Sequence, residues 1–413
     1  MPKIQDIKDV RLKSDLQNGQ DYNKLELYID GVNFPLSAII SLVIREYVFS
    51  TIPTLELTLI DDYALSEMNP LQEGQEIKVN MAINKNADDI VENVFEIVSF
   101  NYSAKPVSQH ANRANVVISA AFKANALIGN LGNKSYPSTT SSGVVKDIAG
   151  DLGIKFEILK DTKDKMNWYR LDQTYNEFMS VLNNKGSAGD NDCPFIYINR
   201  NGKLIYNTLR TALDNDIKKN FTQDSKSAQL AALGSDENFF SSYNLIDASG
   251  FANKIMGGNA VVYSYYDMDN TVYKQIGEIE TTELGDFKNK TIDNINKPSK
   301  HFAFGTQNIS LFDGYYEAIA RNYYLRNTIL STSIIINAQP DGDINLFDVI
   351  NIKILSSKDR NQEAEPFSGR YLVTGIVHAV TPNARSSMWL VLSRDGQNKT
   401  LDYKRFESKL KES

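Results

Sequence analysis

Cysteine and histidine are scarce in this sequence, and their scarcity excludes several kinds of site. The 413 residues include one cysteine, Cys193, so an internal disulfide framework is excluded. The three histidines, His110, His301 and His378, lie far apart, and none has zinc-site spacing. His378 falls within a predicted strand, where a residue of the sheet wall is more common than a ligand. The sequence therefore predicts no metal site and no bound cofactor.

The sequence also lacks a long apolar run and an excess of basic charge. The longest apolar region, residues 36–49, is interrupted by Ser37, Ser41, Arg45 and Glu46 and is too short to span a bilayer. The N-terminus has no apolar core of a secretory signal. A net charge of -7 argues against a general nucleic-acid binder, which needs a basic face. We expect a chain made soluble in a reducing cytoplasm, without a membrane span.

Short apolar runs separated by turn residues are abundant, and they predict mainly β structure. Residues 331–394 alternate branched or aromatic runs with Gly, Pro, Asn and Asp, which is typical of strands and hairpins. Residues 54–122 carry the same order of runs, turns and polar loops. An ordinary antiparallel meander would give the same order, so the pattern alone leaves an internal repeat open.

A stretch with helical periodicity separates these two β segments. A helix is expected after the polar linker 136–142, with Ser141 or Ser142 as its cap and Gly153 at its end. The capping box Thr174-Tyr175-Asn176-Glu177 predicts a second helix. Asn201-Gly202 between apolar runs then predicts a β-hairpin. We interpret residues 129 to about 225 as a small α+β domain.

Composition divides the chain into parts with different expected roles. Residues 226–244 are polar and predict a linker, and residues 260–266 predict a strand. Ser310 and Asp313 are the expected cap of a helix at 311–327. The expected parts are a first β-domain at 1–128, an α+β insert with linker at 129–240, a second β-domain at 241–400 with an excursion at about 265–308, and a charged tail at 401–413.

Catalytic motifs are not evident. Residues 341–345 begin like a calcium loop, but the required Gly and bidentate Glu positions hold Leu346 and Ile352, so a turn is the better interpretation. Carboxylate pairs could serve glycoside hydrolysis, although such clusters at strand ends are usually turns. Cys193 is interpreted as a core thiol. The pairs in question are Asp61-Asp62 and Asp267/Asp269. We predict no catalytic residue and no enzyme.

Three segments together resemble a known family. They are Val144–Ile154, the segment from Asp172 to Tyr206 with its Gly202-Lys203-Leu204-Ile205-Tyr206 ending, and Phe347-Asp348-Val349-Ile350 with Gly369–Val373. In this order they resemble the central hub of tailed-phage baseplates, a family related to the N-terminal part of type VI secretion spike proteins. No single segment is diagnostic, and residues 265–308 match nothing in it.

This resemblance implies a specific architecture and a structural role. It implies two tail-tube-like antiparallel β-barrel or sandwich domains flanking the small α+β domain. It further implies a homotrimer that joins a sixfold tail tube, or its initiator, to a threefold central spike, contacts other baseplate proteins and lines a channel for DNA ejection. Such a protein would be made in the bacterial host cytoplasm and would reside in the virion.

Three alternatives remain open at the level of sequence. The hub of a contractile injection system or bacteriocin would share every feature above. A virion-associated cell-wall hydrolase would need a catalytic Asp or Glu. A receptor-binding β-protein would need exposed aromatics such as Tyr263, Tyr265 and Tyr266, which are more simply explained as sheet residues.

Overall fold

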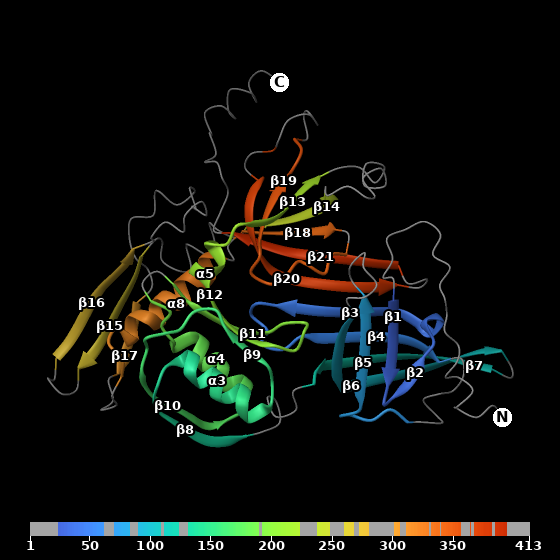
Figure 1. Ribbon diagram of the computed structural model, residues 1–413, viewed down its shortest axis with the longest axis horizontal. Helices are drawn as coiled ribbons and strands as arrows, with labels where there is room; N and C mark the ends of the chain where they lie inside the picture. Colours follow the sequence, from blue (N-terminus) through green and yellow to red (C-terminus); the bar gives the residue numbers. More distant parts are fainter. Residues whose placement is uncertain are drawn as a thin grey trace.

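A computed structural model gives the arrangement of the chain (Figure 1). The residues that the structure describes are 24–61, 70–82, 90–108, 111–123, 131–189, 192–223, 238–247, 260–267, 272–280, 301–305, 311–329, 332–338, 340–356, 364, 367–381 and 385–394.

The first β-domain is a sheet in the strand order β3-β4-β7-β6-β5-β1-β2. Alternation of apolar and polar residues buries one face of each strand, as in β4, where Leu55, Leu57 and Leu59 are buried. Its elements are β1 (Lys24–Ile29), β2 (Val32–Phe34), the 3-10 helix η2 (Leu36–Ala38), β3 (Ile39–Tyr47), β4 (Thr54–Asp61), β5 (Glu76–Ala82), β6 (Ile90–Ser108) and β7 (Ala111–Phe122).

The insert combines short strands with the two helices that the sequence predicts and a third, short helix that it does not. The capping box at Thr174 is present, because the Thr174 and Glu177 side chains each bond the other residue's backbone N–H. Its elements are β8 (Gly132–Thr139), α3 (Ser141–Leu152), β9 (Phe156–Ile158), β10 (Met166–Gln173), α4 (Tyr175–Lys185), β11 (Pro194–Ile198), β12 (Leu204–Thr208) and α5 (Leu209–Leu213). The predicted Asn201-Gly202 hairpin joins β11 to β12.

Two expectations about the insert are wrong in detail. The segment 136–142 is no linker, since Tyr136 lies within β8, is buried and stacks on Phe178 with ring centroids 5.7 Å apart. Its Ser and Thr residues are compatible with a strand because β8 belongs to a two-stranded ribbon with β10. The cap of α3 is Thr140, whose hydroxyl accepts from Gly143 N–H, and neither Ser141 nor Ser142 takes that place.

The second β-domain is a closed ring of six strands. Their order is β19-β13-β14-β18-β21-β20, and β19 also pairs with β20. They are β13 (Ile217–Gln223), β14 (Asn238–Asp247), β18 (Thr332–Ala338), β19 (Val349–Lys353), β20 (Gly369–Thr381) and β21 (Arg385–Arg394). The predicted fold class, mainly β with an α+β insert, is confirmed.

Sheet membership departs from the expected boundaries in two places. β13 was expected in the insert, but it pairs in parallel with β14 and β19 of the second ring. β14 begins at Asn238, inside the expected linker 226–244. Parallel pairing joins segments far apart in the chain, so local patterns do not reveal it.

The excursion expected at 265–308 contains two strands. β16 (Val272–Glu280) and β17 (His301–Gly305) flank β15 (Ala260–Asp267) in a separate three-stranded sheet. This sheet lies to one side, next to α8 (Tyr315–Ile329) (Figure 1). The helix α8 starts later than the expected 311–327. Ser310, one residue of its expected cap, lies outside the described residues.

Asn322 attaches α8 to the insert. Its Nδ2 donates to the carbonyls of Asn184, at 3.0 Å, and Gly186, at 2.7 Å, at the end of α4, and the residue is 1% exposed. Replacing Asn322 by leucine is expected to lower the free energy of unfolding by about 1–3 kcal/mol, because buried carbonyls lose their donor. Urea titration measures this change.

Lys185→Leu, at an exposed position at the end of α4 and beside the carbonyls that Asn322 bonds, is the control for the Asn322 variant. It should change the free energy of unfolding by less than about 0.5 kcal/mol. Equal losses in the two variants would contradict a role for the Asn322 amide.

Candidate functional site: the junction of the two β-domains

The two β-domains join through backbone pairing into one continuous sheet. β3 of the first domain pairs antiparallel with β20 of the second, from Leu42 opposite Val380 to Tyr47 opposite Gly375. β20 lies next to β3, with β21 on the far side of β20 and β4 on the far side of β3 (Figure 1). Thirteen strands therefore share a single hydrogen-bonded sheet. This junction fixes how the two domains lie relative to each other.

The two domains also repeat one topology. The order β3-β4-β7-β6-β5-β1 in the first corresponds to β14-β18-β21-β20-β19-β13 in the second. The pairs agree in direction except the last, which is antiparallel for β5 with β1 and parallel for β19 with β13. This common order decides the repeat that the sequence pattern left open.

The correspondence extends to one turn and one bulge. Gly74 and Phe347, each before the matching strand, have left-handed φ angles of 85° and 71°. Gly74 N–H donates to Ile97 at 2.9 Å, and Phe347 N–H donates to Val373 at 2.8 Å. Directly after Ile97 and Val373, both hairpins have a register shift. The same combination of turn and bulge therefore occurs at the same place in both domains.

A buried polar cluster lies at the junction and unites all three parts of the chain. Arg200, from the turn of the β11–β12 hairpin, donates its backbone N–H to Glu46 Oε2 of β3 at 2.9 Å. Its Nη1 lies 3.2 Å from His378 Nε2 of β20, which accepts because a guanidinium only donates. Its Nη2 donates to the carbonyls of Gly342, at 2.8 Å, and Ile344.

Burial controls the charges in this cluster. Glu46, Arg200 and His378 are each at most 3% exposed. Burial raises the pKa of Glu46 above its ordinary value, although the Arg200 charge opposes this. Burial, with Arg200 adding to it, lowers the pKa of His378 to about 3. His378 is therefore a neutral acceptor at physiological pH, and Arg200 is the cationic donor beside it.

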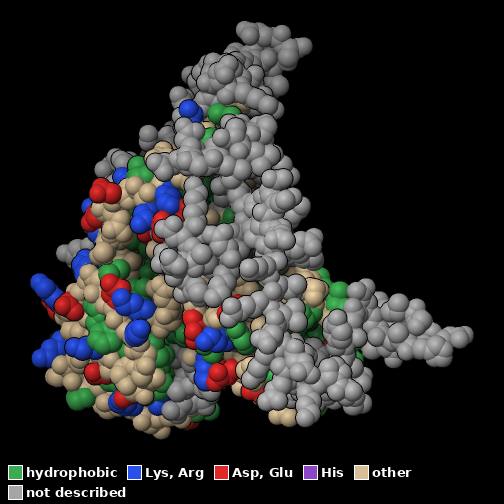
Figure 2. Space-filling view, turned by 45° about the vertical axis from the view of Figure 1, so that its right-hand side comes forward, with side chains coloured by type: hydrophobic (Ala, Val, Ile, Leu, Met, Phe, Trp, Pro, Cys, Tyr) green, Lys and Arg blue, Asp and Glu red, His purple; other side chains and the backbone are tan. Residues whose placement is uncertain are grey.

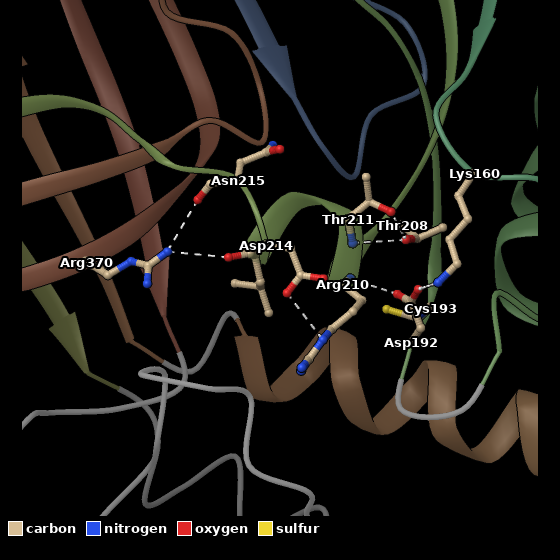
Figure 3. Close-up of polar contacts among 10 residues, drawn as sticks. Lys160, Asp192, Cys193, Thr208, Arg210, Thr211, Asp214, Asn215 and Arg370 are labelled. Atoms are coloured by element: carbon tan, nitrogen blue, oxygen red, sulfur yellow. Dashed lines mark hydrogen bonds and ion pairs between the residues drawn. The ribbon is translucent and has the colours of Figure 1, made fainter.

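A second set of hydrogen bonds attaches the insert to the second β-domain (Figure 3). Arg370 of β20 donates to the carbonyls of Leu213 and Asn215, each at 3.4 Å, at the end of α5. At the start of α5, Asp192 accepts from Arg210 N–H at 2.8 Å and from Lys160 Nζ at 2.7 Å. The insert is thus attached both through its hairpin and through α5.

Of the histidines and the cysteine, the structure describes the side chains of His378 and Cys193, and each is buried. His378 is the buried wall residue that the sequence predicts, whereas His110 lies outside the described residues and only the backbone of His301 is described. Cys193 is fully buried, and burial raises the pKa of its thiol to about 12. Among the described residues, no group of three or more His, Cys, Asp or Glu is arranged to hold a metal ion.

The structure describes the side chain of only one member of the two carboxylate pairs, Asp61. Asp61 is buried at the end of β4, while Asp62 and Asp269 lie outside the described residues. Asp341 belongs to a turn, as predicted, and pairs with Lys219. The side chains of Asp267 and of the tyrosines 263, 265 and 266 on β15 lie outside the described residues.

Sequence reasoning missed Glu46 and Arg200, the two charged members of the cluster. Glu46 was noted only as an interruption of an apolar run. The signal was its position, because Leu42, Ile44, Glu46 and Val48 follow one another on the inward face of β3 and beyond it. A charged residue at a core position predicts a buried partner. Nothing local to Arg200 marks it in the same way.

Similarity to known proteins appears at the level of structure. No protein-family model matches this sequence, and neither does any curated protein. The 43 kDa tail protein of prophage MuSo2 from Shewanella oneidensis aligns with a TM-score of 0.58 and 10% identity, covering 91% of this chain and 99% of that one. The tail protein from Neisseria meningitidis MC58 also gives 0.58 and 10%, covering 90% and 96%.

The chain has the fold of phage tail proteins. The resemblance expected from the sequence is thereby confirmed for the fold, over nearly the whole length of both tail proteins. The E. coli c3393 protein, a type VI secretion component, aligns with a TM-score of 0.47 and 10% identity over 91% of this chain and 78% of that chain. A shared fold does not follow from that score. Within the described residues, no helix is long and apolar enough to cross a bilayer.

Proposed function

We propose that this protein is the structural hub of a phage tail baseplate. In this role it is a homotrimer that joins the sixfold tail tube to the threefold central spike and other baseplate proteins. The internal repeat carries the proposal. Three chains with two matching β-domains each present six similar domains to a sixfold partner, while the trimer itself keeps threefold symmetry for the spike.

The junction supports a structural role without catalysis. A continuous sheet across β3 and β20, fastened by the buried Arg200 cluster, holds the two domains at one fixed angle. A ring needs that constancy, because an angular error at one junction prevents closure. We propose that the protein is no enzyme and that it resides in the virion after synthesis in the host cytoplasm.

The outward face of the shared sheet suits a channel through which DNA passes. On this face Arg45 is paired with Glu56 at 3.0 Å, so the two charges compensate. On the side of the molecule that Figure 2 shows, Lys and Arg side chains intermingle with Asp and Glu over the described surface. A wall without a strongly basic field would let the phosphate backbone slide without being held.

Absolute mass in solution tests the proposal. Light scattering on a size-exclusion column, over a concentration series, should give three times 46.4 kDa, about 139 kDa. Electron microscopy of that species should show a ring with an open axis. A stable dimer, a closed homohexamer, or a monomer at every concentration and with tube and spike proteins added would overturn the proposal.

A further inference from the structure

The β3–β20 junction shows how one such domain receives its neighbour. The first part of β20, Gly369–Leu372, pairs with β19 and so closes its own ring. After the register shift that follows Val373, the same edge leaves β19 and pairs with β3 over Gly375–Val380. One strand edge thus serves its own domain before the bulge and the neighbouring domain after it.

β6 corresponds to β20 and repeats only the first half of this arrangement. Residues Ile90–Glu96 pair with β5, and the register shift follows Ile97. Beyond that point, no strand in the described part of the chain pairs with this edge, although β7 continues along the other edge to Ser108. The large side chains here are open to solvent: Val98 is 54% exposed, Phe100 41% and Tyr102 40%.

β14 corresponds to β3 and offers the complementary edge. Its first residues, Asn238–Phe240, pair with β13, and Tyr243–Asp247 pair with β18 on the other side. Along Tyr243–Asp247 the edge facing away from β18 has no partner strand among the described residues. Tyr243 is 37% exposed and Ile246 52%. In β3 the same edge is the one that β20 occupies.

We infer that the free part of β6 in one copy pairs antiparallel with β14 of a second copy, and this inference rests on the hub proposed above. The edges of β6 and β14 are different, and each carries exposed apolar residues. Contact between two different surfaces of identical copies is heterologous, and such contacts can close into a ring. The pairing also covers edges that would otherwise invite uncontrolled association. A second copy is the occupant because this chain already contains the same junction between its own domains.

The internal junction also specifies the register. The bulges align Gly375 with Ser99, so Val377 corresponds to Asn101 and Ala379 to Ser103. In β3 and β14, shared neighbours in β4 and β18 align Arg45 with Ile246 and Val43 with Asn244. The resulting pairs between copies are Asn101 opposite Ile246, Tyr102 opposite Leu245 and Ser103 opposite Asn244.

Cysteine cross-linking of the full chain tests this register. Ser103 and Asn244 are both exposed, and the native Cys193 is buried and remains in place. The double variant Ser103→Cys with Asn244→Cys should form covalent dimers and trimers under a mild thiol oxidant. Ser103→Cys with Ile246→Cys, displaced by two residues on the same face, should form far fewer. The two single variants, mixed, should give dimers only.

Hydrogen exchange of the wild-type chain gives a second test that does not depend on folding of a variant. Backbone amides of 99–103 and 243–247 should exchange more slowly in the trimer than in a diluted monomer. A trimer by light scattering without the predicted cross-link, or without this protection, would overturn the edge assignment and leave the hub proposal standing. Absence of any oligomer would overturn both.

Discussion

Replacing Arg200 by methionine is expected to lower the free energy of unfolding by about 3–5 kcal/mol. The guanidinium supplies donors to buried carbonyls of Gly342 and Ile344 and to His378, and methionine supplies none. Because these side-chain contacts link the insert to the second β-domain, their loss should also uncouple those two parts. Urea unfolding should then lose its single cooperative transition.

The two tryptophans make this uncoupling measurable. Trp168 is buried in the core of the insert, and Trp389 lies on β21 of the second ring. In single-tryptophan versions of the native chain the two transitions should coincide, and with Arg200→Met they should separate. Arg210→Met is the matched control, because Arg210 is 45% exposed and pairs with Asp214 at the surface. If both arginine variants behave alike, the cluster does not couple the domains.

Acidification is expected to destabilise the protein through His378. The pKa of this residue is about 3 in the folded chain and ordinarily near 6.5, so between these values the unfolded state binds more protons. Stability contributed by neutral His378 is therefore present above pH 6.5 and is lost as the pH falls below it. The slope approaches about 1.4 kcal/mol per pH unit.

His378→Gln isolates this effect, since glutamine keeps an acceptor for Arg200 but does not titrate. Between pH 6.5 and 4.5 the native chain should lose about 2–3 kcal/mol more than the variant, as measured by urea titration at each pH. Parallel curves for the two proteins would contradict the assignment.

Glu46 acts with the opposite sign. Its folded pKa is raised, so the stability it contributes is present at low pH and is lost as the pH rises above its ordinary 4.5. Glu46→Gln should therefore abolish the loss of stability that occurs as the pH rises toward neutrality. It should leave unchanged the loss of stability that His378 causes at acidic pH.

The sequence predicted the local elements well where one residue's neighbours along the chain decide the structure. The alternation of Leu55, Leu57 and Leu59 predicts a strand with one buried face, and the fold has it. Thr174 with Glu177 predicts a helix start, and both reciprocal bonds form. Where such signals were read one residue off, as at Thr140, the competing Ser141 and Ser142 offered the same capping chemistry.

Elements whose partners lie far away in the chain were misplaced. β13 follows the insert in sequence but joins the second ring, because its pairing with β19 spans more than a hundred residues. The helix α8 follows the excursion, yet its Asn322 bonds the end of α4. The cluster at the junction was missed for the same reason, since 154 residues separate Glu46 from Arg200 and 178 separate Arg200 from His378.

The sequence by itself therefore determined the class of the fold, the strands and turns, and the outline of a repeat. These follow from side-chain alternation and turn chemistry, which act over a few residues. Only the tertiary structure decided which edges are joined and which remain open, and which charged residues meet in the core. Backbone hydrogen-bonding groups are the same at every residue, so strand partners are chosen by packing and register across the whole chain.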